Sequence, residues 1–371
     1  MIGHVEPRAS QVAYAARIAA PEVLQRLLTA AGPSGHEGAP AAVWREAAGT
    51  FARVEGDLMG SSTARVAGTE TDPPGPTLAI IGHIDEIGLI VTNVDDKGFL
   101  VLAGLGGWDP QILVGQRVEV LTAGGPVAGV IGKKPIHLLR EEERKKVAEL
   151  RDLHIDIGAV SAEEAREAVG VGDVAILAGE PLELHGGRVA SRALDNRLGA
   201  FIALEAARLV ARDGGAPGDV VAVAGVQEEI TMAGARTTAY ALQPDAAIVV
   251  DVTHASDAPG IDAREVGEHP LGSGAVVARG ATLHPAVSGL LLDVAREDGI
   301  AHTVEATTGR TGTDADAVHL SRGGIPTGMV SIPLRYMHSP VEVVQLSDIE
   351  ACAQLVAAFA RRLTADVVFA R

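Results

Sequence analysis

A run of apolar residues with charged side chains at its centre constrains the fold of this chain more than any other feature. In IIGHIDEIGLIV, residues 80–91, isoleucine, leucine and valine occupy most positions, as in a buried strand. His83, Asp85 and Glu86 interrupt the run. Because burying charged groups without partners is costly, the folded chain must bring compensating groups to this strand.

Apolar strand-like segments alternate with helix-like segments along most of the chain. The predicted strands are residues 77–91, 219–229, 245–255 and 323–333. Between and after them lie segments with helical spacing, among them residues 196–214, 286–300 and 346–363. This alternation predicts an α/β fold whose mostly parallel sheet carries helices on both faces.

The pattern changes between residues 93 and 184, where short β-rich pieces are separated by glycines. Such spacing predicts a small barrel or sandwich. A charged stretch after residue 139 predicts a solvated helix, followed by a second short amphipathic helix. We therefore expect an α/β domain built from residues 1–92 and 185–371, interrupted by a β-rich domain at 93–184.

Composition narrows the classes of function. With 31 basic and 48 acidic residues, the 371-residue chain has a net charge of −17, which disfavours nucleic acid and anionic membranes as partners. The single cysteine, Cys352, rules out an internal disulfide and an all-cysteine metal site. The N-terminus shows no apolar signal segment, and no stretch has the roughly 18 apolar residues of a membrane span. The cytoplasm is the expected location.

Acids and histidines fall at the ends of the predicted strands or in turns beside them. They are His83, Asp85, Asp195, Glu228, Glu229, Asp251 and His338. Ligands of open α/β sheets bind near the carboxyl ends of the strands, so these side chains can converge at one edge. Imidazole and carboxylate ligands suit zinc, cobalt or manganese, and two such ions would compensate the buried acids.

Two pairs within this set have a more specific interpretation. His83 and Asp85 are two residues apart and would share a strand face, so that His83 could bind metal while Asp85 holds its imidazole. Glu228 and Glu229 are adjacent at a strand end, where one could bind metal and the other carry a proton. Taken singly, each residue also fits an ordinary role as a helix cap, a surface acid or a hydrogen-bonded loop residue.

The motifs GHIDEIG, ALDNRLG, QEE, DVTHA and MHSPVEVV, in this order, resemble the M42 family of metallopeptidases. GPSGHE, KKPIHLL, LHIDIGA and TGTDADAVHL extend the resemblance over nearly the whole chain. The family comprises cytosolic aminopeptidases, and some members have been labelled endoglucanases. The resemblance implies an α/β peptidase domain with an inserted, PDZ-like dimerisation domain, short peptide substrates and a homo-oligomer that is commonly a dodecamer.

The resemblance also implies two divalent metal ions about 3.5–4 Å apart, the usual spacing of two-metal sites. Carried over residue by residue, Asp195 would bridge the two ions. His83 and Asp251 would complete one site, and Glu229 and His338 would complete the other.

By the same resemblance Glu228 is the general base and Asp85 the carboxylate that orients a ligand. One departure concerns the pocket: the family's Gly-Leu-Arg-Gly-like stretch after the glutamate pair is replaced here by Ile230, Thr231 and Met232. That change leaves the preferred N-terminal residue of the substrate open. The zinc, cobalt or manganese identity of the ions and the number of subunits are likewise open.

Three other functions compete with an aminopeptidase. A related two-metal deacetylase or carboxypeptidase would use the same ligand types on N-acyl amino acids. A glycosidase fits less well, because it needs two free carboxylates and the 3% aromatic content offers few rings to stack on sugars. A non-catalytic binding module would be expected to have lost a ligand or the base, yet every expected position is filled.

Overall fold

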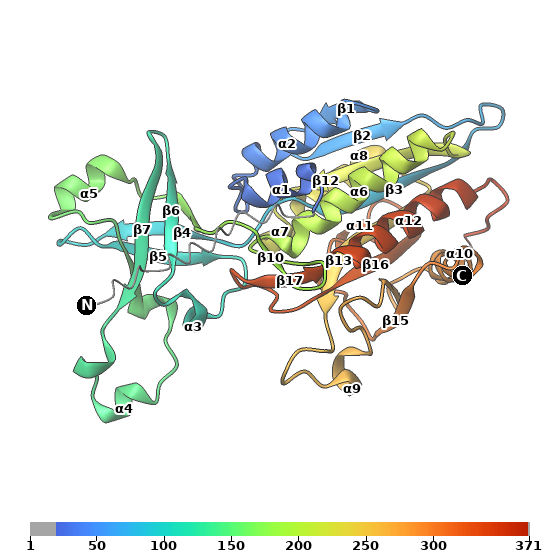
Figure 1. The fold of residues 1–371 in the computed structure, drawn as a ribbon. Helices are drawn as coiled ribbons and strands as arrows, with labels where there is room; N and C mark the ends of the chain where they lie inside the picture. The colour runs from blue at the N-terminus through green and yellow to red at the C-terminus, as the bar shows by residue number, and fades with distance from the viewer. Residues whose placement is uncertain (1–19, 370–371) are drawn as a thin grey trace, which may run out of the picture.

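The structure of the protein is a computed structural model, and it describes residues 20–369. Within that range the chain forms an eight-stranded sheet packed with helices and, beside it, a closed six-stranded barrel (Figure 1). A third, three-stranded sheet is made of β10 (Leu182–Leu184), β11 (Arg188–Ser191) and β17 (Glu342–Gln345). The predicted lack of a signal segment concerns residues 1–11, which lie outside the described residues.

The large sheet has the order β1-β2-β12-β3-β13-β16-β14-β15. Its strands are β1 (Arg53–Gly56), β2 (Ser62–Val66), β3 (Gly75–His83), β12 (Gly218–Gly225), β13 (Ala246–His254), β14 (Ala275–Gly280), β15 (His302–Thr307) and β16 (Thr327–Leu334). The four central strands, β12, β3, β13 and β16, are mutually parallel, while the edge strands add antiparallel pairs. Their carboxyl ends therefore meet at one edge of the sheet.

Helices cover both faces of this sheet. On β3, Leu78 and Ile80 pack into the larger core, and the alternate residues Ala79 and Ile81 pack into a smaller core on the opposite face. The larger core is covered by α1 (Glu22–Thr29), α2 (Gly38–Ala48), α6 (Leu194–Arg212), α10 (Pro285–Glu297) and α12 (Leu346–Arg362), and the smaller by α8 (Ala233–Leu242) and α11 (Ala315–Val318). The predicted α/β architecture is confirmed.

The barrel is closed in the order β4-β5-β8-β7-β6-β9, and all its strand pairs are antiparallel. Its strands are β4 (Gly88–Val94), β5 (Leu100–Leu105), β6 (Arg117–Thr122), β7 (Gly125–Lys133), β8 (Leu153–Asp156) and β9 (Val174–Leu177). Short helices connect them: α3 (Pro110–Leu113), η1 (Ile136–Leu138), α4 (Glu141–Arg144), η2 (Leu150–Asp152) and α5 (Ala162–Ala168). The predicted small β-rich insertion is thus a barrel with a core of its own.

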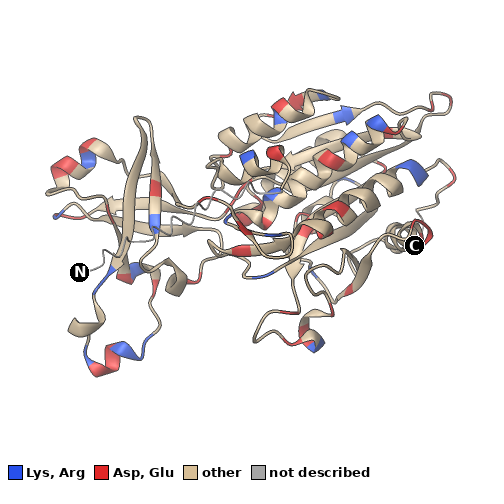
Figure 2. Ribbon diagram, viewed as in Figure 1, with Lys and Arg blue, Asp and Glu red and all other residues tan. Residues whose placement is uncertain are grey.

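Three predicted elements differ from the structure. The strand predicted at 219–229 ends at Gly225, and Glu228 and Glu229 begin the short helix α7 (Glu228–Thr231) instead of ending the strand. The continuous strand at 77–91 is divided, because β3 ends at His83 and β4, which begins at Gly88, belongs to the barrel. The charged segment after residue 139 forms only the single turns α4 and η2 rather than one helix, and α4 and α5 both carry charges of each sign (Figure 2). Without an apolar face to bury, such a segment gains too little from packing to stay helical over its whole length.

The remaining short helices are α7 (Glu228–Thr231) and α9 (Ala263–Val266). Cys352 is buried in α12, as its apolar surroundings predict. Among residues 20–369, the helices are all too short or too polar to cross a bilayer.

Contact between β3 and α6 leaves no room for a side chain at Gly82. A β-carbon there would lie 2.2 Å from the carbonyl carbon of Gly199 and 2.4 Å from the nitrogen of Ala200. We expect Gly82→Ala to lower the free energy of unfolding by about 1–3 kcal/mol, because backbone atoms must move apart. Guanidinium denaturation measures this change.

The matched control is Gly289→Ala in α10, where no described atom lies within 4 Å of the added carbon. Alanine favours a helix over glycine by about 1 kcal/mol, so this variant should be at least as stable as the parent protein. Equal stability of the two variants would contradict the close packing of β3 on α6.

Candidate metal centre

A pocket of about 550 Å³ opens at the carboxyl ends of the central strands. Six of the seven residues predicted for the site line it: His83, Asp195, Glu228, Glu229, Asp251 and His338. The seventh, Asp85, is fully buried beside the pocket. Parallel strand order brings these side chains together although they are spread over more than 250 positions, from 83 to 338.

Asp195 lies between two imidazoles. Its Oδ1 is 3.3 Å from Nε2 of His83, and its Oδ2 is 3.4 Å from Nε2 of His338. Nε2 of His338 is also 3.4 Å from Oε2 of Glu229. Ligand atoms bound tetrahedrally at about 2.0–2.1 Å from one zinc ion stand about 3.3–3.4 Å apart, so these separations fit shared coordination.

Asp85 connects His83 to the glutamate pair. Its Oδ1 is 3.4 Å from Nδ1 of His83 and accepts a hydrogen bond from the backbone nitrogen of Glu228 at 3.0 Å. Its Oδ2 accepts from the backbone nitrogen of Glu229 at 3.2 Å and from Oγ of Ser34 at 2.5 Å. Asp85 lies beyond the end of β3, so it reaches His83 across a turn and not along a shared strand face.

His338 is held by the barrel. It lies in the turn between β16 and β17 with φ of +60°, and its Nδ1 is 2.7 Å from the carbonyl oxygen of Gly107, in the loop after β5. Since a carbonyl only accepts, Nδ1 carries the proton and Nε2 keeps the lone pair that a metal needs. A β-carbon at Gly107 would lie 3.2 Å from this Nδ1.

Asp251 was expected at a strand end, but β13 continues past it to His254. Its buried carboxylate faces the pocket from within the strand, and its Oδ1 accepts a hydrogen bond from the backbone nitrogen of Val252. Its side of the pocket also includes His254, which is exposed. Two histidines elsewhere in the family-like motifs lie outside this pocket: His319 donates to the carbonyl of Ala315 through Nδ1, and His137 lies in η1 of the insertion.

The buried acids of this pocket call for a cation. Burial, and then the neighbouring carboxylates, raise the pKa of Glu228 to about 10 and that of Asp251 to about 8. Burial also raises the pKa of Asp314, which lies next to the pocket, to about 7. Among the described residues, Oε1 of Glu229 and both carboxylate oxygens of Asp314 are buried without a hydrogen-bond partner.

Ligand atoms of three residues lie close enough together for one ion. These atoms, one each from His83, Asp195 and Glu229, are all within 4.8 Å of one another. Divalent ions bound to such oxygens and nitrogens would satisfy the carboxylates that burial otherwise keeps protonated. The donor set therefore fits the predicted metal ions.

Glu86, the third charged residue of the opening run, is compensated differently. Its carboxylate forms ion pairs with Arg192 and with Arg197, the latter at 2.7 Å, and accepts a hydrogen bond from the nitrogen of Gly32. Arg197 is fully buried and also donates to the carbonyls of Leu27 and Ala30. The arginines flank Asp195 in sequence, so this ion cluster ties the Asp195 turn to the end of β3.

Two buried residues behind the site were not predicted. Ser34 bonds Asp85, and Glu342 accepts hydrogen bonds from the backbone nitrogens of Asp195 and His338. Both stand in the motifs GPSGHE and MHSPVEVV, but a motif does not show which backbone groups a side chain contacts.

The departure from the family pattern lies in the pocket, since Ile230, Thr231 and Met232 all line it.

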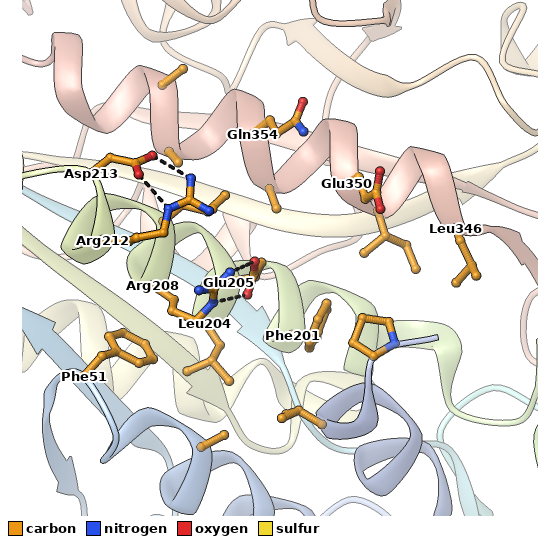
Figure 3. A pocket seen from close by; sticks show the side chains of 18 of the residues that line it. Phe51, Phe201, Leu204, Glu205, Arg208, Arg212, Asp213, Leu346, Glu350 and Gln354 are labelled. Atoms are coloured by element: carbon orange, nitrogen blue, oxygen red, sulfur yellow. Dashed lines mark hydrogen bonds and ion pairs between the residues drawn. The ribbon is translucent and has the colours of Figure 1, made fainter. Parts of the chain in front are cut away.

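A larger groove of about 910 Å³ lies elsewhere, between α1, α2, α6 and α12. Two of its arginines form close ion pairs, Arg208 with Glu205 and Arg212 with Asp213 (Figure 3), and Arg361 lies 3.7 Å from Asp213. The lining includes no histidine or cysteine, so it lacks the chemistry of the pocket at the strand ends.

Comparison with known proteins identifies the family of the chain. Residues 60–355 match the sequence profile of the M42 glutamyl aminopeptidase family. The lysyl aminopeptidase of Pyrococcus furiosus is 32% identical over 346 residues, which cover 92% of this chain and 97% of the relative.

Solved structures resemble the whole fold. A TET aminopeptidase from the marine sediment archaeon Thaumarchaeota archaeon SCGC AB-539-E09 superposes with a TM-score of 0.88 at 36% identity, over 93% of this chain and 97% of that one. The TET1 peptidase of Pyrococcus horikoshii, which can assemble into a tetrahedron or a large octahedral shell, superposes with a TM-score of 0.80 at 32% identity, over 92% and 99%.

Protonation of the site predicts how stability depends on pH. The pKa values of Glu228, Asp251, His83 and His338 are all raised, by burial for the acids and by nearby carboxylates for the imidazoles. A raised folded-state pKa contributes stability at low pH that is lost as pH rises through it. Chelator-treated protein should therefore lose stability from about pH 4, where these acids ionise in the unfolded chain, up to the folded values of about 8 for Asp251 and about 10 for Glu228.

Metal-loaded protein should keep its stability over the same range, because cations replace the protons. The gap between the two unfolding midpoints, measured by denaturation at each pH, should widen as pH increases. A chelated protein that is as stable at the alkaline end as at the acidic end would contradict this account.

Proposed function

Because the chain belongs to the M42 glutamyl aminopeptidase family, we propose that it is a two-metal aminopeptidase that removes N-terminal residues from short peptides. One observation carries the proposal: the two oxygens of the Asp195 carboxylate face two different imidazoles at 3.3 and 3.4 Å. A carboxylate shared in this way is suited to bridge two ions.

By the family resemblance, we assign the residues to two sites around Asp195. His83 and Asp251 would complete one site, and Glu229 and His338 the other. Zinc or cobalt suits this nitrogen and oxygen donor set, and manganese is also compatible with it. When bound, such ions lower the pKa of water and polarise the scissile carbonyl.

Glu228 is the proposed general base. Its carboxylate lines the pocket with Oε2 3.7 Å from Nε2 of His83, and its backbone nitrogen is tied to Asp85. Burial, and then the neighbouring carboxylates, raise the pKa of Glu228; bound cations would oppose both effects and leave Glu228 ionised at neutral pH. Glu228 would accept a proton from the attacking water and donate it to the leaving amine.

Two groups orient the imidazoles. Asp85 faces Nδ1 of His83, and the carbonyl of Gly107 accepts from Nδ1 of His338, so that both Nε2 atoms point to Asp195. Fixing the tautomer of a ligand histidine in this way raises its affinity for metal. Asp85 also accepts hydrogen bonds from the backbone nitrogens of Glu228 and Glu229 in the first turn of α7. In the proposal, Glu228 is the base and Glu229 is a metal ligand.

Assembly and location follow the same proposal. We expect residues 93–184 to act as a dimerisation domain and the chain to form a homo-oligomer, for which a dodecamer is the candidate assembly. In support, a solved structure of the Pyrococcus horikoshii TET1 peptidase is described as a dodecamer. We place the activity in the cytoplasm, with short peptides as substrates.

A substrate panel tests the reaction. Aminoacyl p-nitroanilides should be hydrolysed by protein supplied with zinc, cobalt or manganese, chelation should stop the reaction, and N-acylated amino acids should resist. Glu228→Gln should lower kcat by about 10²- to 10⁴-fold, the usual contribution of a general base, while metal content stays near that of the parent protein.

Cleavage of the N-acyl substrates alone would instead favour a deacetylase or carboxypeptidase. Full activity of the Glu228→Gln protein would remove Glu228 from its role as base but leave the reaction class intact.

The bridging role of Asp195 has a separate test. Asp195→Asn replaces one carboxylate oxygen by an amide nitrogen, which has no lone pair for a cation. At least one ion per subunit should therefore be lost, as measured by elemental analysis. The matched control is Asp219→Asn, because Asp219 pairs with Arg65 at 2.6 Å and does not line the pocket. Undiminished metal and activity in the Asp195 variant would rule out the bridge.

A further inference from the structure

Glu342 is a buried carboxylate that contacts the site only through backbone groups. It begins β17 and is 2% exposed. Its Oε2 accepts a hydrogen bond from the nitrogen of Asp195 at 3.1 Å, and its Oε1 accepts one from the nitrogen of His338 at 2.9 Å. One side chain therefore joins two residues that are 143 positions apart, at 195 and 338.

Asp195 lies in the non-helical first turn of α6, and His338 lies in the turn between β16 and β17, which the bridge between Arg335 and Val343 closes. The Asp195 turn follows β11 and contains Ala193 with φ of +60°, and the His338 turn precedes β17 and contains Tyr336 and His338, both with φ of +60°. Positive φ is unfavourable for residues with a β-carbon, so surrounding contacts must hold such turns. β11 and β17 are paired, with Ser191 opposite Glu342, which sets the turns side by side.

Only an acceptor with two oxygens serves both turns. The two backbone N–H groups converge on the opposite oxygens of one carboxylate. Without it, the N–H of Asp195 would be a buried donor without a partner, and the part-buried N–H of His338 would lose its acceptor. Glutamine offers a single acceptor oxygen, and its amide group would face the second N–H. Loss of either bond frees one turn to move relative to the other.

We propose that Glu342 is a positioning residue that holds the Asp195 and His338 turns at the separation needed to share divalent metal ions. The inference rests on the proposed function, since it assumes that Asp195 and His338 bind metal. It adds to that function a residue that touches neither metal nor substrate. Removing such a contact behind a metal ligand typically weakens metal binding about 10- to 100-fold.

The chain supplies a matched control in Asp348. This carboxylate in the first turn of α12 is also fully buried, and its two oxygens likewise accept from two backbone nitrogens, those of Gly272 and Gly274 at 2.8 Å each. Neither Asp348 nor those glycines line the metal pocket. Replacing Asp348 by asparagine reproduces the chemical change without touching the site.

The experiment titrates chelated full-length protein with cobalt(II) and follows visible absorption. Glu342→Gln should weaken cobalt binding about 10- to 100-fold and alter the absorption spectrum, whereas Asp348→Asn should keep both while losing thermal stability. Glu342→Asp keeps the charge and both acceptors but is shorter by one methylene, so a smaller loss is expected. If Glu342→Gln does not fold, the cobalt affinity of Glu342→Asp is compared with that of Asp348→Asn instead.

Three outcomes would overturn the inference. Cobalt affinity of Glu342→Gln within about twofold of the parent would make Glu342 a structural residue only, given that contacts behind ligands usually matter more. An equal loss in Asp348→Asn would attribute the effect to general destabilisation. Failure of the parent protein itself to bind cobalt would remove the proposed function and this inference with it.

Discussion

Repulsion among buried carboxylates is the constraint on which the rest of this structure depends. Glu228, Glu229 and Asp251 enter one pocket with Asp195, and burial together with their neighbours raises the pKa of the first three. The pKa of Asp195 itself is lowered, because His338 and His83 face its two oxygens and outweigh burial. Divalent cations, in the proposed function, supply the remaining positive charge. The contacts around the pocket hold these carboxylates and imidazoles close to one another.

The scaffold meets this demand with parallel strands and irregular turns. The strands β3, β12, β13 and β16 bring their carboxyl ends to one edge, where predicted ligands lie at the end of β3, within β13 and in the segments after β12 and β16. Turns are mobile unless contacts secure them, so buried polar groups lie behind the ligands. Asp85, the Glu86–Arg197 ion pair and the carbonyl of Gly107 each fix one turn. Because Gly107 belongs to the inserted barrel, the two parts of the molecule share the site.

Particular residues show how far the sequence could be interpreted. Charged residues at the ends of apolar runs pointed to His83, Asp195 and Glu229, since hydrophobic periodicity and chain order are enough to locate strand ends. The same reasoning misplaced Asp251, because β13 continues beyond it. It also joined β3 to β4, since an apolar run of 15 residues, 77–91, does not reveal that its two halves enter different sheets.

What the sequence determined by itself is the class of fold and the identity of the polar residues at the strand ends, because both follow from local periodicity. Tertiary structure alone decided the partners: arginines for Glu86, a barrel carbonyl for His338, and the two backbone nitrogens that Glu342 accepts from. Apart from the bond between Glu342 and the nitrogen of His338, those contacts join positions more than a hundred residues apart. Their geometry depends on turn conformation and strand order, which no local pattern encodes.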